Sequence, residues 1–495
     1  YKSPILKISF TYFLTIGLLL VSCGQISEEV ENVTYEGEIA IPIIESGSVS
    51  FLSLWNGDVP GQSLLVQSDG SLIFRYDNQP IVVTTEDILG TLDLPIVTAL
   101  TDTLTLLPFE LPANIILDQA IISEGSLLFR YEPTDEVEEI IFTLPQLSID
   151  GEVLTVRTGG GNGSTVPLDL SGYTFEPTRN QLEIRYTALD GAGNPTLLDN
   201  AGILARPVLQ FVKGNWGREM FQLSTEVIPI DLYDDRVVNG QLFFSEPTIT
   251  ATIQSSFGVP IRTQIDILRG RTQRGDMPID PTAIDGVDIN FPTERGQSKT
   301  TVLQLDYTNS NIVEVFDAQL TEIEYGLTAI TNPDNDDNLI AFLEDTSSFR
   351  AEVVVEVPVV GRTENFVAVE TFDTPFDEID DLSEGEFKLI VDNELPIAAD
   401  LQFFFLDNNQ QILDSLFEAT TNLVPAASVD TNGQVTAKVS STTFVPVAAA
   451  KMEQLLQASQ IQAVATFQTT NNGQQEVVLN ASQFLRFRMG LKFKP

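Results

Sequence analysis

From Ile39 onward the chain is a succession of short runs of β-branched and aromatic residues separated by turn residues. Examples are Ser48 to Leu54, Ser63 to Val66 and Ser71 to Tyr76, the last two divided by Ser68-Asp69-Gly70. β-Branched and aromatic side chains suit a pleated, half-buried surface, whereas Gly and Asp favour turns. Strands this short and closely spaced indicate β-sandwiches or barrels. The sequence therefore predicts an all-β, mainly antiparallel fold.

A weak internal repeat supports modular construction. The segment Gly70 to Asp77 (GSLIFRYD) returns as Gly125 to Glu132 (GSLLFRYE), and Leu182 to Tyr186 (LEIRY) is a fainter third copy. Neighbouring residues of a strand point to opposite faces of a sheet, so each Arg-Tyr pair places its two side chains on different faces. A strand with one buried face explains the pattern. A ladder of Arg side chains facing an anionic ligand is the alternative.

The C-terminal part is predicted to contain one short helix and a closing strand. Val447 to Ala458 follows Pro446 and has apolar residues at helical spacing. The final strand alternates, with Arg486, Arg488 and Lys492 on one face and apolar residues on the other. We expect this basic face to pair with acidic neighbours, and docking to a partner is the alternative.

Two segments share a strand, a polar kink and an apolar-Pro-Ile step. They are Gly240 to Ile261 and Gly385 to Ile397. This design resembles LEA-type (WHy) β-sandwiches and other immunoglobulin-like envelope modules. The resemblance implies tandem immunoglobulin-like or LEA-like sandwich domains. The expected division is a signal peptide at 1–22, an acidic tether at 23–38, an N-terminal β domain containing the 55-residue repeat at 39–200, a middle sandwich at 201–375, an acidic linker at 376–384 and a C-terminal sandwich at 385–495.

The segment Phe13 to Cys23 (FLTIGLLLVSC) decides where the chain is expected to reside. Lys2 and Lys7 precede its apolar run, which is the layout of a secretory signal and short for a permanent bilayer span. The final Leu20-Val21-Ser22-Cys23 resembles a bacterial lipobox, which implies cleavage before Cys23 and acylation of its sulfur. An ordinary signal peptide with a chance cysteine is the alternative.

Composition excludes several function classes. The chain has no His, and Cys23 is its single cysteine, so Ser-His-Asp triads, Cys-His pairs and His/Cys zinc sites cannot form. The formal net charge is −44, which repels nucleic acid and makes nucleic-acid binding an unsuitable function. Membrane contact is therefore expected to come from a lipid on Cys23. Carboxylate chemistry and metals bound by oxygen ligands remain possible, and an enzyme acting through paired carboxylates is the last alternative.

One acidic loop is a candidate metal site. Asp334, Asp336 and Asn338 occupy alternate positions, like the first ligands of a calcium loop, and Asp345 stands at the twelfth position. Leu339 occupies the place of the usual central Gly, and Asp345 replaces the usual Glu. Calcium is thus the one cofactor that the sequence suggests. The alternative interpretation of this loop is a polar turn that binds no metal.

Several short motifs spread along the chain resemble motifs of large outer-membrane and envelope lipoproteins of the Bacteroidota. They are Asp169 to Tyr173, Phe211 to Gly217, Glu246-Pro247 with Ser256 to Pro260, and Val357 to Gly361. The resemblance implies a non-enzymatic lipoprotein, anchored in the outer membrane and facing the periplasm or the cell surface. We expect a structural or accessory binding subunit with an envelope protein partner. The alternatives are a carbohydrate-binding lipoprotein of a nutrient-uptake system, which needs exposed aromatic platforms, and a lipid carrier with an apolar cavity.

Overall fold

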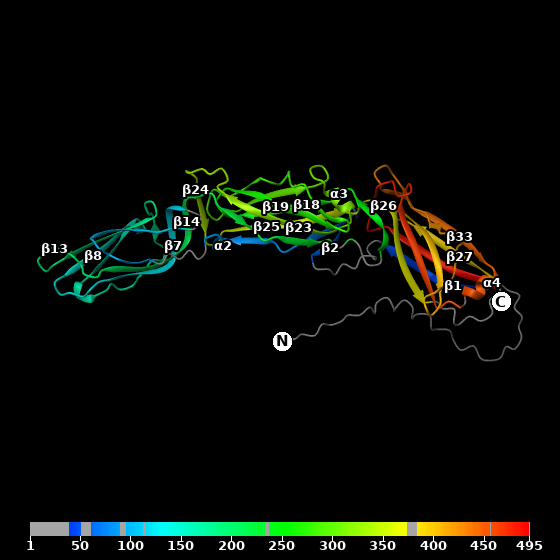
Figure 1. The fold of residues 1–495 in the computed structure, drawn as a ribbon, viewed down its shortest axis with the longest axis horizontal. Coiled ribbons are helices and arrows are strands. Elements are labelled where there is room, and N and C mark those ends of the chain that lie inside the picture. The colour runs from blue at the N-terminus through cyan, green and yellow to red at the C-terminus, as the bar shows by residue number, and fades with distance from the viewer. Residues whose placement is uncertain are drawn as a thin grey trace, which may run out of the picture.

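The computed structural model describes residues 39–50, 61–89, 96–111, 115–230, 232, 237–373, 384–455 and 457–494. Three regions follow one another along an elongated molecule (Figure 1). An eleven-stranded sheet lies at one end, two six-stranded sheets lie in the middle, and a four-stranded and a seven-stranded sheet lie at the other end. The described strands pair antiparallel, which confirms the predicted all-β class.

The eleven-stranded sheet is organised around the long antiparallel pair β7 and β14. Its core contains Phe129 and Phe142, which are fully buried and stacked with ring centroids 4.0 Å apart. The strands of this sheet are β5 (Ile96–Ala99), β6 (Leu104–Pro108), β7 (Ile116–Arg130), β8 (Glu139–Ile149), β9 (Glu152–Thr158), β10 (Leu168–Asp169), β11 (Thr174–Phe175), β12 (Gln181–Leu189), β13 (Pro195–Thr196), β14 (Gly202–Asn215) and β24 (Ile340–Glu344).

The central sandwich consists of the two six-stranded sheets, and buried side chains of both sheets belong to one continuous apolar cluster that extends into the eleven-stranded sheet. One sheet contains β2 (Gln62–Val66), β3 (Leu72–Asp77), β4 (Ile81–Thr84), β18 (Thr248–Ser255), β22 (Lys299–Leu305) and β25 (Ser348–Pro358). The other contains β15 (Met220–Gln222), β16 (Glu226–Pro229), β19 (Ile261–Thr272), β20 (Gly275–Pro278), β21 (Asp288–Ile289) and β23 (Leu320–Thr331).

The terminal sandwich holds both the first and the last described strands. Its four-stranded sheet has the order β1 (Ile39–Ser50), β36 (Phe484–Lys494), β27 (Glu384–Asn393), β33 (Val439–Val447). Its seven-stranded sheet contains β17 (Val237–Phe244), β26 (Val360–Asp373), β28 (Ile397–Leu406), β29 (Ile412–Ser415), β30 (Thr421–Val424), β34 (Gln460–Thr469) and β35 (Val477–Val478), and β31 (Ser428–Val429) pairs with β32 (Val435–Ala437) beside it. Leu389 and Val391 of β27 pack with Ala399 and Leu423 of the seven-stranded sheet, so apolar side chains join the two layers.

The expected C-terminal helix is present as α4 (Ala449–Leu455), whose Met452 and Leu455 are buried against Phe387 and Phe405. Two further short helices were not anticipated, namely α2 (Thr85–Leu89) and α3 (Ile312–Asp317). Each is too short to show a convincing helical period in the sequence. A 3-10 turn also spans Gly160–Asn162.

The repeated Arg-Tyr strands have the alternation that the sequence predicts. Tyr76, Tyr131 and Tyr186 are at most 5% exposed. Arg130 and Arg185 are exposed on the opposite faces of their strands, and Arg75 is half-buried. Arg75 lies 3.2 Å from Glu356, and Arg185 pairs with Glu183. Carboxylates of the chain itself therefore contact two of the three Arg side chains, which favours the structural explanation over an anionic-ligand ladder.

The sheets do not follow the expected consecutive division at 39–200, 201–375 and 385–495. β1 pairs with β36, β3 pairs with β25, and β24 completes the sheet that contains β14. Each of these pairs joins strands that the expected boundaries assign to different domains, or extends a sheet across a boundary. Local periodicity identifies strands but carries no information about distant partners, which is why the sequence did not reveal this. The expected signal peptide, Cys23, the tether at 23–38 and linker residues 376–383 lie outside the described residues.

Candidate functional site

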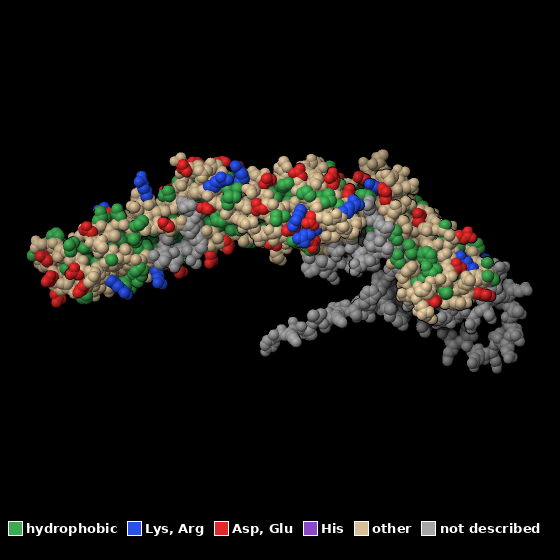
Figure 2. Space-filling view, viewed as in Figure 1, with side chains coloured by type: hydrophobic (Ala, Val, Ile, Leu, Met, Phe, Trp, Pro, Cys, Tyr) green, Lys and Arg blue, Asp and Glu red, His purple; other side chains and the backbone are tan. Residues whose placement is uncertain are grey.

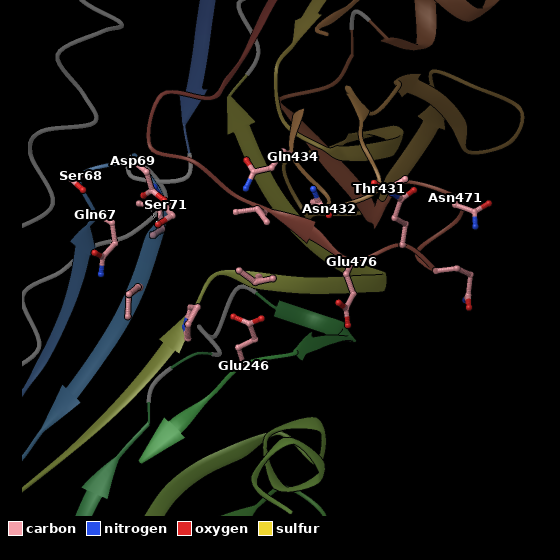
Figure 3. A pocket seen from close by; sticks show the side chains of 17 residues that line it. Gln67, Ser68, Asp69, Ser71, Glu246, Thr431, Asn432, Gln434, Asn471 and Glu476 are labelled. Carbon is pink, nitrogen blue, oxygen red and sulfur yellow. Dashed lines mark hydrogen bonds between the residues drawn. The ribbon is translucent and has the colours of Figure 1, made fainter. Parts of the chain in front are cut away.

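An open cavity of about 970 Å³ lies where the central sandwich meets the terminal sandwich, and we refer to it as the joint cavity. On one side it is lined by the β2–β3 turn, with Gln67, Asp69 and Ser71 (Figure 3). Across from this turn stand Asn432 and Gln434 from the β31–β32 turn. The cavity is thus built from loops that are distant in the sequence.

Backbone hydrogen bonds fix the geometry of this junction. The N–H of Val359 donates to the carbonyl of Leu72 at 2.8 Å, and the N–H of Leu479 donates to the carbonyl of Val359 at 3.1 Å. Leu479 and Val359 are both buried, at 6% and 7% exposure. The side-chain amide of Asn480 donates to the carbonyl of Asp69 at 3.0 Å. Central and terminal sandwiches are therefore joined by hydrogen bonds as well as by apolar contact.

Glycine is required at two turns beside the joint cavity. Gly70 has φ +85°, and a Cβ there would lie 2.6 Å from the side chain of Asn480. Gly433 has φ +75°, and a Cβ there would lie 2.6 Å from the carbonyl of Glu476. A left-handed conformation and a close approach both exclude larger residues at these positions.

Two carboxylates of the joint cavity, Asp69 and Glu476, accept hydrogen bonds from hydroxyl groups. The Ser71 hydroxyl and N–H donate to Asp69 Oδ1 at 2.7 and 2.9 Å, and these bonds lower the pKa of Asp69 below its ordinary value. The Ser245 hydroxyl donates to Glu476 Oε1 at 2.8 Å. Asp69 therefore stays ionised and accepts hydrogen bonds, which does not suit a general acid at neutral pH.

Amide side chains dominate the rest of the lining. Gln67, Asn432, Gln434 and Asn471 are exposed and border the cavity. The Asn432 and Gln434 backbones are fixed because both N–H groups donate to Asp430 Oδ1, at 2.8 and 2.9 Å. An amide offers both a donor and an acceptor, as a ligand with several hydroxyl groups requires. None of the residues that line this cavity is aromatic.

A second, smaller cavity of about 570 Å³ lies in the eleven-stranded sheet between β8, β9 and the β12–β13 turn. Arg157 and Glu139 line it and form an ion pair of 2.8 Å with each other. Both groups are more than 40% exposed, so solvent screens the pair strongly. Neither cavity has the enclosed apolar lining that a lipid carrier needs.

The candidate calcium residues are not brought together as ligands. Asp334 lies 3.2 Å from the Arg262 guanidinium, and Asp336 Oδ1 accepts the N–H of Asn338 at 2.9 Å. Asn332 closes the turn by donating to the Asp336 carbonyl at 3.0 Å, and the N–H of Asp345 donates to the carbonyl of Gln210 on β14. Within the described ranges, no group of three Asp, Glu, His or Cys side chains could hold a metal ion. The alternate polar residues of this loop form a hydrogen-bonded turn.

Neither of the chain's two tryptophans is seen as an exposed platform for carbohydrate stacking, and the exposed rings of Tyr307 and Phe444 do not line the joint cavity. Trp216 is 1% exposed, and Trp55 lies outside the described residues. Sequence reasoning also missed the amides of the joint cavity. The Asn432-Gly433 dipeptide signalled a turn, but nothing local indicated that the turn faces Asp69.

The remaining comparisons are with membrane spans and with known proteins. No helix of the described residues is long and apolar enough to cross a membrane. No protein-family model matches the chain, and no curated protein matches it.

Solved structures give only distant likenesses. A protein of Parabacteroides distasonis described as secreted is 13% identical, with a TM-score of 0.34, over 58% of this chain and 89% of its own. A particle structure of infectious bursal disease virus, Gx strain, is 9% identical, with a TM-score of 0.14, over 94% of this chain and 82% of its own. Structural similarity at these scores assigns neither a family nor a function to this protein.

Proposed function

We propose that this chain is a non-enzymatic, lipid-anchored envelope protein, akin to the large envelope lipoproteins of the Bacteroidota that it resembles. Acylated Cys23 attaches it to the outer membrane. The elongated body then presents the eleven-stranded sheet to an envelope partner, as a structural or accessory subunit of an assembly.

The position of the chain's entry point at one end of the elongated molecule carries this proposal. The chain enters its described part at Ile39, which pairs with Phe493 in the terminal sandwich. The β12–β13 turn lies at the opposite end of the molecule (Figure 1). Residues 23–38 can span at most roughly 55 Å when fully extended. An anchor at Cys23 would therefore hold the terminal sandwich near the membrane and leave the eleven-stranded sheet farthest from it.

The surface of the molecule supports a binding role over catalysis. The space-filling view shows hydrophobic, acidic and polar side chains interspersed along the face drawn (Figure 2). Exposed apolar residues of the eleven-stranded sheet include Val97, Leu104 and Leu106, at 72%, 50% and 54% exposure. Leu104 and Leu106 belong to β6, which pairs only with β12 among the described strands. A strand with one unpaired edge and exposed apolar side chains suits the addition of a partner's strand.

Accessibility on intact cells tests the anchor and the orientation. An epitope inserted at Gly193 is suitable, because this turn residue has open space around it. For an outward-facing protein, we expect the antibody to bind intact wild-type cells. In Cys23→Ala the binding to cells should be lost, and the protein should leave the membrane fraction. Protection of the epitope, with fractionation still dependent on Cys23, would place the protein on the periplasmic side. Membrane fractionation that is unchanged in Cys23→Ala would refute the anchor.

The joint cavity favours one second candidate, which is glycan binding. Exposed amides and ionised carboxylates provide hydrogen-bond partners for sugar hydroxyls, although stacking rings are missing from the lining. A glycan array probed with wild type and with Asn432→Ala/Gln434→Ala tests this candidate. Gln273→Ala, an exposed amide in the central sandwich, is the matched control. Array signals that survive the cavity variant would eliminate it.

A further inference from the structure

The outer face of the four-stranded sheet is basic, in contrast to the rest of the chain. Side chains on β27 and β33 alternate in exposure along each strand, and the described basic side chains of β36 are exposed. The exposed basic residues on this face are Lys388 of β27 and Arg486, Arg488 and Lys492 of β36, and the exposed Lys438 directly precedes β33; we refer to these five residues as the basic face. The sequence identified the three residues on the last strand. Lys388 joins them through the pairing of β27 with β36, and Lys438 does so because β33, which begins at the next residue, pairs with β27.

Strand register shows how much of this charge has an acidic neighbour on the sheet. Glu386 stands opposite Lys492, and Asp392 stands opposite Arg486. Arg488 stands opposite Ile390, and Lys388 stands opposite Gly490. Two positions of the basic face thus have an acidic residue directly opposite in the sheet. The basic face keeps a surplus of positive charge.

Asp392 illustrates this surplus. The Ser440 hydroxyl donates to Asp392 Oδ1 at 2.5 Å and is the main cause of the lowered pKa of this carboxyl, with Lys438, Arg488 and Arg486 contributing through their charge. Three basic side chains therefore lie near enough to one carboxylate to favour its ionised form.

The location of the basic face adds a second argument. The whole chain has 26 Lys and Arg against 70 Asp and Glu. An anionic surface therefore repels most of the molecule and attracts this face. β1, which follows the tether directly, belongs to the same sheet. A tether of limited length keeps this sheet close to any membrane that holds Cys23.

We propose that the basic face docks on the phosphate-bearing headgroups of anionic lipids, an inference that rests on the proposed anchoring at Cys23. Guanidinium groups match phosphate oxygens with paired hydrogen bonds, and ammonium groups add point charges. Phe444, which is 52% exposed with the Lys388 ammonium 5.6 Å from its ring centroid, contributes an apolar ring that can enter the boundary between headgroups and acyl chains. Acylation supplies attachment, and the basic face sets the orientation of the molecule on the membrane.

A single introduced cysteine can report this docking, because acylated Cys23 leaves no other thiol. Thr442→Cys places a fluorescent label on the outer face of β33, and Thr155→Cys places the same label on the exposed edge of β9. The acylated full-length protein is bound to vesicles of phosphatidylcholine alone or mixed with phosphatidylglycerol. Quenching by a headgroup-attached quencher is then measured at low and high salt, with co-flotation as the measure of attachment.

We expect the label at position 442 to be quenched on anionic vesicles at low salt, and the label at 155 to be unaffected. Each basic side chain near an anionic leaflet strengthens association about fivefold. Arg486→Glu/Arg488→Glu should therefore abolish the quenching without loss of flotation. Arg130→Glu/Lys213→Glu, an equal charge change at exposed positions of the eleven-stranded sheet, is the matched control and should leave the quenching in place.

Three results would overturn the inference. The label at 442 could be quenched equally on neutral and anionic vesicles, or the control variant could abolish quenching as strongly as the test variant. The label could also be shielded in solution without vesicles, which would mean that another part of the protein occupies the face. Failure of flotation would instead refute the anchor, and the docking proposal would fall with it.

Discussion

Removing the Phe129 ring should destabilise the eleven-stranded sheet more than any exposed substitution does. Phe129 and Phe142 are fully buried and stacked with an interplanar angle of 3°. Truncating a fully buried Phe to Ala costs about 3–5 kcal/mol, and an aromatic pair contributes about 0.5–1.5 kcal/mol beyond its buried area. We therefore expect Phe129→Ala to lower the free energy of opening of this sheet by about 4 kcal/mol.

The measurement must be local, because a chain of several packed regions is not expected to unfold in one step. Native-state hydrogen exchange of amides in β7 and β8 reports the opening free energy of these strands. A double-mutant cycle with Phe129→Leu and Phe142→Leu isolates the ring–ring term, which we expect to be about 1 kcal/mol.

Phe444→Ala is the control, since its ring is 52% exposed in the terminal sandwich. It should leave exchange in β7 and β8 unchanged. A loss under about 1.5 kcal/mol for Phe129→Ala, or a coupling of zero, would show that the stacked core does not hold this sheet together.

The other predictions concern a carboxylate, a turn and the acidic loop. Hydrogen bonds from Arg269 and Arg271 keep the pKa of Glu324 below its ordinary value of 4.5, so this group should stabilise the central sandwich above that pH. The contribution should be lost as pH falls through the lower folded pKa, and Glu324→Gln should flatten the acid limb of a stability–pH curve. Gly433→Ala should destabilise the junction more than Gly193→Ala destabilises its turn, since the two have φ of +75° and +82° but only Gly433 has a close neighbour. Equal losses in melting temperature would show that the close approach is unimportant. Millimolar calcium should leave the melting temperature unchanged from that in chelator, and a rise that Asp336→Ala removes would contradict our description of the loop.

The sequence predicted what depends on neighbouring residues. Strand alternation is a local property, so burial of Tyr76, Tyr131 and Tyr186 followed from the repeat. Exposure of the basic residues on the last strand followed from the alternation of that strand. The helix near the C-terminus was also predictable, because Met452 and Leu455 repeat at helical spacing.

Pairing between distant strands could not be predicted in the same way. Residues of β3 and β25 contact each other although most of the chain between them belongs to other sheets. The joint cavity depends on such pairing, since Asp69 and Asn432 become neighbours only after the two sandwiches meet. The calcium hypothesis also depended on a contact between distant parts of the chain that local spacing does not reveal. Alternate spacing places Asp334 and Asp336 near each other, but Arg262, from another strand, engages Asp334.

The pairing of β1 with β36 constrains the order in which this protein can mature. A chain that is synthesised from its N-terminus delivers β1 long before its partner strand β36. Until then the hydrogen-bonding edge of β1 has no native partner and is open to misassociation. Loss of β36 would leave β1 and β27 without the strand that lies between them. The terminal sandwich can therefore be completed only after β36 has joined strands from both parts of the chain, so its stability reports on the pairing of segments more than 400 residues apart in the sequence.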